Sequence, residues 1–256
     1  AITHTFLAPT MIGMALDSPG SATTLQQVFV TASAFPMALK TKFAARFPHV
    51  EVFESYGATE IGLVTLLHPW DPPDKAATVG RAAFGYELRI YDEAGGRLPH
   101  GEIGEIFVKG PCMSFGYIGE VPMKTGQVRD EFVTAGDLGS IDRDGFLSVA
   151  DRRDDLIVSG GLNVYPAEVE NVLLEVPGVR EVAVVGIPDE LWGHVVVAAI
   201  VGDATAAQLA AACRERLAGY KVPRRFEFLP ELPRNLAGKI LRRVVRADLS
   251  ASHAAS

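Results

Sequence analysis

The sequence predicts a multidomain protein of the α/β and α+β classes, in which three parts of different architecture follow one another. Residues 1–79 alternate short apolar segments with a helical one, and residues 80–150 carry closely spaced strand candidates without a helix between them. Residues 151–256 mix helices with strands. Each pattern is typical of a different packing of layers, and 256 residues suffice for more than one domain.

The first part is expected to be a partial α/β subdomain. Residues 25–32 end in a strand-like apolar run, and residues 36–47 place apolar side chains at a helical spacing after a proline. Residues 50–57 alternate and are β-branched, so they predict a strand that runs into a glycine turn. A strand–helix–strand order favours a parallel sheet covered by helices.

The second part is expected to form a small distorted β-barrel or a bent antiparallel sheet. Its strand candidates, at 86–92, 101–110 and 146–151, are separated by turns rich in Gly, Pro and Asp. Closely spaced strands without intervening helices are typical of such folds.

The third part is expected to be a compact α+β domain. A helix is predicted to begin at Pro166, with one apolar face formed by Val169, Val172, Leu173 and Val176. A second helix over 205–218 has an apolar face formed by Leu209, Ala212, Cys213 and Leu217. Strands are predicted at 180–188, 194–202 and 224–229, and the tail 250–256 is expected to be frayed.

The composition argues against several classes of function. The net charge of −7 disfavours a nucleic-acid binder, which carries a basic excess. No apolar run reaches the roughly 20 residues of a membrane span, and the start lacks the pattern of a signal peptide. The cytoplasm is the expected compartment. Cys112 and Cys213 lie far apart in the chain, so each is expected to be a small buried residue and not a metal ligand.

The string "NLAGKILRR" (235–243) raises the question of a phosphate-binding loop around Lys239. Such a loop needs Gly, four residues, then Gly-Lys-Ser/Thr. Pro233 stands where the first glycine should be, and Ile240 follows the lysine. The phosphate-loop interpretation fails, and on its own Lys239 would be an ordinary surface lysine.

The string "ESYGATEIG" (54–62) lies at the end of a predicted strand, where open α/β sheets bind ligands. The hydroxyl of Thr59 could bind phosphate oxygens together with nearby backbone N–H groups. Glu60 could hold Mg²⁺, which takes one or two carboxylates plus phosphate oxygens. The alternative is a plain turn with a stacked Tyr56.

Asp137, between glycines, has a carboxylate that could accept both hydroxyls of a ribose, and Arg152 could add a donor to the same sugar. The alternatives are an ordinary turn aspartate and a surface ion pair of Arg152 with a neighbouring aspartate (Asp151, Asp154 or Asp155).

Four strings occur in one order: "YGATE", "GDLGSIDRDGFL", "DRRDDLIVSGGLNVYPAEVE" and "LPRNLAGKILRR". Together with "VFVTASAFPMAL" and "YKVPRRFEFLPELP" they cover nearly the whole chain. The chain resembles the adenylate-forming superfamily of acyl- and aryl-CoA synthetases, peptide-synthetase adenylation domains and firefly-type luciferases. The resemblance implies that a carboxylic acid reacts with ATP to give an acyl-adenylate and pyrophosphate, after which the acyl group passes to a thiol.

The resemblance also implies site residues for ATP/AMP, Mg²⁺ and CoA. Adenine would lie between Tyr56, beside Gly57, and the Ser33–Ala34 backbone; Thr59 would contact phosphate, Glu60 would bind Mg²⁺, and Asp137 and Arg152 would hold the ribose. Lys239 would be the catalytic lysine of adenylation, since a cation offsets the repulsion between carboxylate and phosphate. Asp154 matches the hinge of a mobile C-terminal domain, and Gly160 lies where the pantetheine arm enters.

The sequence departs from the family in several places, one of which is the lack of the family's common Trp in 116–138, a stretch whose residues 115–127 lie outside the described structure. The glycine-rich phosphate loop is missing, so the chain, which starts abruptly at Ala1, is expected to be the C-terminal half of an enzyme, and the missing half is its expected partner. "TASA" (31–34) replaces a glycine pair, and Ala135 is an insertion. The isolated chain is expected to lack full activity.

Three functions stay open at this stage. CoA is the favoured acceptor because "SGGLNVYPAEVE" is usual in CoA ligases. The alternatives are a ligase that loads a carrier protein's phosphopantetheine and an inactive nucleotide-binding fragment or interaction module. The acid substrate is not readable from the sequence: four apolar residues could line its pocket or be plain core, namely Phe35, Phe53, Ile61 and Leu63.

Overall fold

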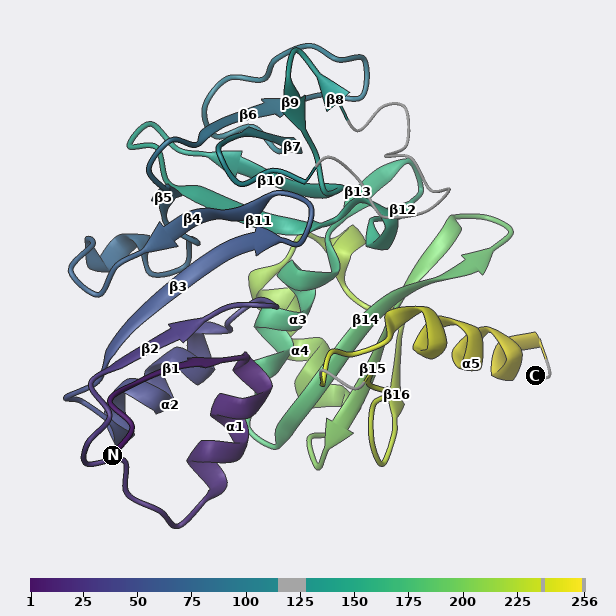
Figure 1. Ribbon diagram of the computed structural model, residues 1–256. Helices are drawn as coiled ribbons and strands as arrows, with labels where there is room; N and C mark the ends of the chain where they lie inside the picture. The colour runs from purple at the N-terminus through teal and green to yellow at the C-terminus, as the bar shows by residue number, and fades with distance from the viewer. Residues whose placement is uncertain (115–127, 236–237, 255–256) are drawn as a thin grey trace. The chain divides into compact units, whose positions relative to one another are not determined.

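The computed structural model describes residues 1–114, 128–235 and 238–254, without the side chains of 252–254 (Figure 1). The chain divides into two compact units, Ala1–Arg153 and Asp154–Ser256. The described residues form five helices: α1 Pro9–Asp17, α2 Met37–Arg46, α3 Pro166–Leu174, α4 Ala206–Arg216 and α5 Arg242–Ala254. None of them is long and apolar enough to cross a membrane. The three-part division at residues 79 and 150 stays a prediction.

The first sheet of unit 1 has the strand order β1-β2-β3-β4-β5. Its strands are β1 His4–Leu7, β2 Gln27–Val30, β3 Glu51–Ala58, β4 Gly62–Leu67 and β5 Arg81–Ala82. The first three run parallel, as the strand–helix–strand pattern predicted, and β4 and β5 add antiparallel pairs. One face packs against α1 and α2 through a core that includes Ile12, Val28, Val30, Phe43 and Phe47.

The opposite face of this sheet carries a row of aromatic rings. Phe6, Phe29 and Phe53 lie in register on β1, β2 and β3, with ring centroids 5.0 and 4.8 Å apart. Trp70 meets Phe53 edge-on at 5.6 Å. We call Phe6, Phe29, Phe53 and Trp70 the aromatic row. Its two end members remain largely exposed, Phe6 at 65% and Trp70 at 68%.

The second sheet of unit 1 is antiparallel and bent. Its strands are β6 Glu87–Tyr91, β7 Gly104–Lys109, β8 Val128–Arg129, β9 Phe132–Val133, β10 Asp137–Ile141 and β11 Leu147–Arg152. β7 pairs with β6 on one side and with β9 and β10 on the other, and β10 pairs with β11. Among the described residues no ladder joins β6 to β11, so the sheet is open. Of the two sequence-based alternatives, the bent sheet is therefore the one observed.

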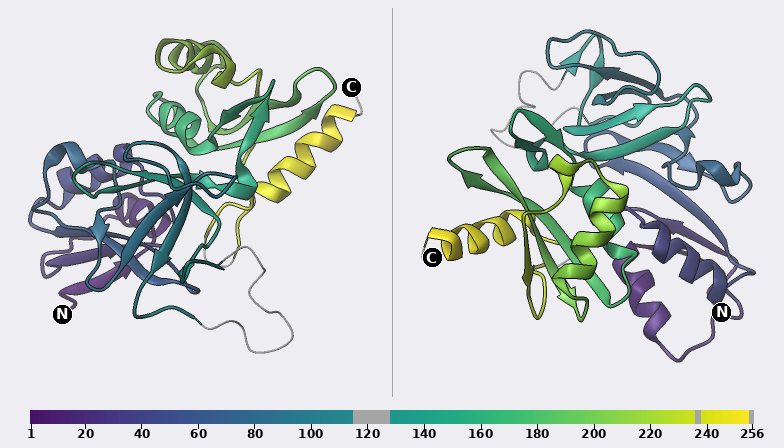
Figure 2. Two further views of the ribbon diagram at one scale, coloured as in Figure 1. Left: turned by 90° about the horizontal axis from the view of Figure 1, so that it is seen from above. Right: turned by 180° about the vertical axis from the view of Figure 1, so that it is seen from behind.

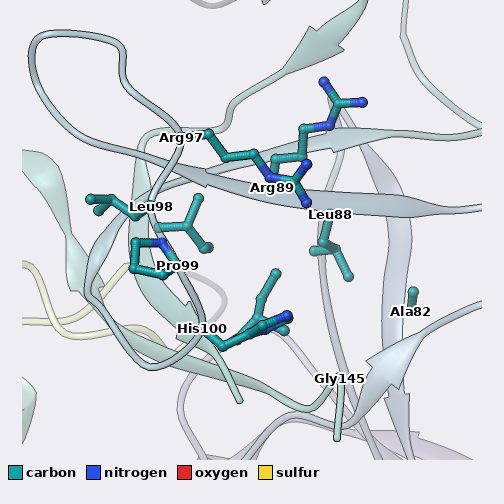
Figure 3. A pocket seen from close by; sticks show the side chains of 10 residues that line it. Ala82, Leu88, Arg89, Arg97, Leu98, Pro99, His100 and Gly145 are labelled. Atoms are coloured by element: carbon teal, nitrogen blue, oxygen red, sulfur yellow. The ribbon is translucent and has the colours of Figure 1, made fainter. Parts of the chain in front are cut away.

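A hollow of about 530 Å³ lies beside β6 (Figure 3). Its lining is mostly apolar and includes Leu88, Ile90, Leu98 and Ile141. Figure 3 shows Arg97 and His100 beside the same hollow. The loop that contains 97–100 lies along β6 at this hollow, where the N–H of Leu98 donates to Ile90 O at 2.8 Å.

Unit 2 is built on one sheet with helices on both faces. Its strands are β12 Ile157–Ser159, β13 Leu162–Val164, β14 Val179–Asp189, β15 Gly193–Gly202 and β16 Arg225–Phe228. The order is β13-β12-β15-β14, and β16 pairs parallel to β15. α3 and α4 cover one face and α5 the other (Figure 2).

The helical faces predicted for α3 and α4 are confirmed. Val169, Val172, Leu173 and Val176 are buried, as are Leu209 and Cys213, while Ala212 and Leu217 pack against the same core. The prediction of a frayed tail is wrong for residues 250–254, which belong to α5. That helix is held by Val245 and Leu249, which lie one turn apart and are buried against the sheet.

The two cysteines behave differently from each other. Cys213 is buried as expected, and burial raises the pKa of its thiol to about 11. Cys112 is exposed, so the prediction that both are buried is wrong. Cys112 lies in the turn after β7, outside any strand or helix.

Candidate active site

The "YGATE" segment lies at the carboxyl end of β3 and in the turn that leads to β4. The parallel strands β1, β2 and β3 end at this same edge of the first sheet. A pocket of about 240 Å³ is found here, lined by Phe6, Thr31, Ser55, Tyr56, Gly57, Ala58, Gly62 and Leu63. Its position agrees with the general rule that open α/β sheets bind ligands outside the carboxyl ends of their strands.

Tyr56, Asp137 and Arg152 lie together within unit 1. The Tyr56 hydroxyl donates a hydrogen bond of 2.8 Å to the Asp137 carboxylate across 81 residues of sequence. Arg152 Nε lies 3.5 Å from the other carboxylate oxygen. Asp137 and Arg152 face each other in the β10–β11 ladder, which explains how two residues predicted to share one ligand become neighbours.

The surroundings of Asp137 keep its charge partnered. Its side chain is buried, and a buried carboxylate is costly unless it is paired and hydrogen-bonded. Burial, followed by the negative charge of Asp137, raises the pKa of the Tyr56 phenol, whereas Arg152 lowers it. Tyr56 therefore stays protonated and acts as a donor.

Thr59 and Glu60 lie in the turn between β3 and β4, with Thr59 exposed and Glu60 half-buried. The turn is held by backbone groups, since Glu60 O accepts from the Ser114 N–H at 2.8 Å. Among the described residues no group of three or more His, Cys, Asp or Glu could hold a metal ion. A single carboxylate still fits Mg²⁺ bound mainly through phosphate oxygens and water.

Gly57 has a structural reason to be glycine. A Cβ at this position would lie 2.1 Å from Gly62 O, on the paired strand β4. The close crossing of β3 and β4 thus excludes any side chain and keeps the pocket edge as bare backbone.

Of the four apolar residues considered for an acid pocket, only Leu63 lines the 240 Å³ pocket. Phe35 and Ile61 are buried in two different core clusters. Phe53 belongs to the aromatic row. For Phe35 and Ile61 the structure therefore favours the plain core interpretation.

Lys239 lies in unit 2, at the end of a tight turn. The Asn235 side-chain oxygen accepts from Lys239 N at 2.9 Å, and Asn235 N donates to Lys239 O, also at 2.9 Å. Gly238 has φ 78°, a left-handed conformation that suits glycine. These bonds fix the backbone of Lys239, whose side chain is exposed.

Gly160 lies on the turn between β12 and β13 of unit 2, against Trp192. Its N–H donates to Trp192 O at 2.9 Å, and a Cβ would stand 2.7 Å from the indole ring. Arg224 covers the same indole at 4.3 Å. Sequence analysis missed Trp192, although "WG" directly precedes a predicted strand. Asp154 is the first residue of unit 2.

The distribution of the site residues follows the two units. Unit 1 holds the Tyr56, Thr59, Glu60, Asp137 and Arg152 group together with Ser33 and Ala34. Unit 2 holds Asp154, Gly160 and Lys239.

Two family models match the chain. The model of the AMP-binding enzymes matches residues 1–118, and that of the AMP-binding enzyme C-terminal domain matches residues 168–239. The chain belongs to the adenylate-forming, AMP-binding enzyme family. The uncharacterized acyl-CoA ligase YhfT of Bacillus subtilis is 38% identical over 252 residues, which are 98% of this chain and 51% of YhfT.

Solved structures of this family resemble the chain closely. ATP-bound MatB from Rhodopseudomonas palustris matches with a TM-score of 0.90 and 34% identity, over 98% of this chain and 52% of MatB. The o-succinylbenzoate CoA synthetase MenE of Bacillus subtilis, in complex with ATP and a magnesium ion, matches with a TM-score of 0.83 and 35% identity, over 94% of this chain and 51% of MenE. The chain thus spans about half the length of the relatives it matches.

The "TASA" segment, which the resemblance places where the family has a glycine pair, has an unusual backbone. Ala32, in the "TASA" segment after β2, has φ 81°, and it is one of the few non-glycine residues here with a positive φ. A left-handed conformation costs an alanine about 1–2 kcal/mol. The loop that leads to Ser33 and Ala34 therefore keeps the shape of a glycine loop without the glycine.

We expect Ala32→Gly to stabilise the protein by about 0.5–1 kcal/mol. The change removes a left-handed strain of about 1–2 kcal/mol, and this gain is partly offset because glycine stabilises the unfolded chain by about 0.4–1 kcal/mol through its greater entropy. Urea unfolding measures the change. Ala34→Gly is the matched control, since Ala34 is exposed and has no positive φ. The control is expected to lose about 0.4–1 kcal/mol, and an equal loss in both variants would contradict the strain.

Proposed function

We propose that the chain is the C-terminal half of an ATP-dependent acyl-CoA synthetase. The enzyme would convert a carboxylic acid and ATP into an acyl-adenylate and pyrophosphate, then transfer the acyl group to CoA. The observation that supports this proposal most directly is the Tyr56–Asp137–Arg152 group beside the pocket at the carboxyl end of β3. We use "whole enzyme" for the polypeptide that joins this chain to a preceding half.

In this proposal unit 1 binds the nucleotide. Asp137 accepts the ribose hydroxyls and Arg152 adds a donor, while the Tyr56 hydroxyl, held by Asp137, sets the orientation of the ring against adenine. The exposed Ser33–Ala34 backbone faces the other side of the base. Thr59 contacts phosphate, and Glu60 contributes a carboxylate to Mg²⁺, which would neutralise phosphate charge.

Lys239 supplies the cation for adenylation. Attack of a carboxylate on the α-phosphate brings two anions together, so a positioned ammonium stabilises the charge that builds up in the transition state. For the second step the C-terminal domain would turn at Asp154 and withdraw Lys239. Gly160 would then lie beside the path of the pantetheine arm, with the Trp192 indole packed against its bare backbone. The position of Asp154 at the start of unit 2 supports this hinge.

The aromatic row supports a partner for unit 1. Parallel sheets are normally covered on both faces, yet Phe6 and Trp70 remain largely exposed on the face opposite α1 and α2. The relatives are about twice as long as the matched region. The preceding half of the whole enzyme is the occupant that fits this face.

CoA and a carrier-protein phosphopantetheine present the same thiol arm, so the acceptor is a separate question. The string "SGGLNVYPAEVE" favours CoA. A carrier-loading ligase would make thioester faster with holo-carrier than with free CoA. An inactive fragment would bind AMP and yet give no thioester in the whole enzyme.

We expect Asp137→Asn to weaken AMP binding by the isolated chain at least about tenfold, because hydrogen bonds to a charged group contribute about 1.5–3 kcal/mol. Isothermal titration calorimetry measures the affinity. Asp144→Asn, in an exposed turn on β10–β11, is the control and should bind AMP as the parent does. Equal affinity in all three proteins would contradict the ribose role of Asp137.

We expect Lys239→Ala in the whole enzyme to slow adenylate formation about 100-fold or more, as for loss of a group that stabilises transition-state charge. Pyrophosphate release measures this step. Thioester formation from synthetic acyl-adenylate and CoA should be unchanged, because Lys239 serves only the first step. Lys42→Ala, at an exposed lysine of α2, is the control. Unimpaired pyrophosphate release by Lys239→Ala would overturn the proposal.

We expect Phe6→Asp to weaken association of the chain with a separately produced preceding half at least about tenfold, because it places a charge in an apolar contact. Leu191→Asp is the control, since Leu191 is 82% exposed and lies in unit 2. Gel filtration and calorimetry measure the association. Binding of Phe6→Asp as tight as that of the control, or pairing of two copies through this row in place of the preceding half, would contradict the assignment.

A further inference from the structure

Arg242 is the first residue of α5 and stands three positions after Lys239. Its Nη2 and Nε donate to the two oxygens of Glu170 at 2.6 and 3.2 Å. Its Nη1 reaches Asp155 at 3.4 Å. A guanidinium that engages both oxygens of a carboxylate is held in orientation as well as in position. The side chains are largely buried, Arg242 at 23% exposure and Glu170 at 13%.

Glu170 connects Arg242 to the framework of unit 2. It lies on α3, and its Oε1 also accepts from the N–H of Val184 at 2.8 Å. Val184 is on β14, which is an end strand of the sheet. One carboxylate therefore joins the helix α3, the strand β14 and the start of α5. The hydrophobic cores already hold these elements together, so packing alone does not require the ion pair.

A second arginine holds the other end of the lysine turn. Arg234 Nη1 donates to Gly238 O at 2.6 Å, and its Nη2 lies 2.9 Å from Glu181 on β14. The N–H of Leu241 donates to Pro233 O at 2.8 Å and closes the base of the turn. Lys239 thus lies between two arginines, each tied to a carboxylate of the unit's framework.

We infer that Arg242, held by Glu170, is a positioning residue for Lys239 and sets where its ammonium group enters the adenylation site. This inference rests on the proposed catalytic role of Lys239. The lysine stem is long and flexible, so the position of its ammonium depends on a fixed backbone. The contact of Arg242 with Asp155, next to the hinge position Asp154, ties the same backbone to the start of unit 2.

Loss of Arg242 would free one end of the turn and shift the ammonium without removing it. Displacement of a reacting or stabilising group by about 1 Å can cost about 100-fold in rate. We expect Arg242→Ala in the whole enzyme to lower kcat for pyrophosphate release about 10- to 100-fold. KM for ATP and acid should be unchanged, because Arg242 holds neither substrate.

The discriminating readout is the second half-reaction. Thioester formation from synthetic acyl-adenylate and CoA should be unchanged in Arg242→Ala, since Lys239 takes no part in it. A general defect in unit 2 would slow both half-reactions. Arg216→Ala is the matched control, because it breaks an exposed ion pair with Glu175 in the same unit. This control should leave both half-reactions unchanged.

Two further measurements separate positioning from folding. Arg242→Lys should recover part of the lost rate, because an ammonium still pairs with Glu170 but cannot engage both oxygens in a fork. In the isolated chain, hydrogen exchange at the amides of Lys239 and Leu241 should be faster in Arg242→Ala, while exchange in β15 stays unchanged.

The results also distinguish this inference from the proposed function. If Lys239→Ala leaves pyrophosphate release intact, the function itself is wrong. If Lys239→Ala is inactive in that step while Arg242→Ala is either fully active or equally slow in both half-reactions, the positioning role alone is wrong.

Discussion

The hydrogen bond from Tyr56 to Asp137 is the contact on which the arrangement of unit 1 depends. It joins the end of a parallel strand to the start of a strand in the second sheet, across 81 residues. Because Asp137 is buried, its charge needs the phenol and the Arg152 guanidinium beside it. The hydrogen bond to this carboxylate thus orients the Tyr56 ring, and the β10–β11 ladder places Arg152 beside the same carboxylate.

Unit 2 also positions a charged group through ion pairs, but there the group is a cation. Its proposed reactive group is the exposed ammonium of Lys239, and carboxylates on α3 and β14 hold the arginines on either side of that lysine in the chain. Arginine suits this task because its planar fork is preorganised for a carboxylate, whereas lysine offers a compact charge on a flexible stem. In the proposed reaction the arginines would therefore anchor the turn, and the lysine would carry the charge to the substrate.

The sequence predicted what depends on local pattern and missed what depends on distant partners. The apolar faces of α3 and α4 follow a helical period, which the sequence shows. α5 has a polar, Ala/Ser-rich end, and of its described side chains only Val245 and Leu249 are buried. An open or closed second sheet depends on pairing of β6 with a remote strand, which periodicity does not report. Family likeness indicated Tyr56, Asp137, Arg152 and Lys239. It gave no sign that Glu170, 72 residues from Arg242, would hold the lysine turn.

The place of β14 at the end of its sheet has a consequence for how the protein avoids unwanted assembly. A long end strand offers a row of free backbone groups to any other extended chain. Here Glu170 occupies the amide of Val184 midway along the strand, and the charged Glu181–Arg234 pair lies at its beginning. An incoming strand would have to displace the Glu170 carboxylate before its own backbone could bond to the N–H of Val184. The contacts of Glu170 and Glu181 thus disfavour edge-to-edge pairing of β14 with another strand.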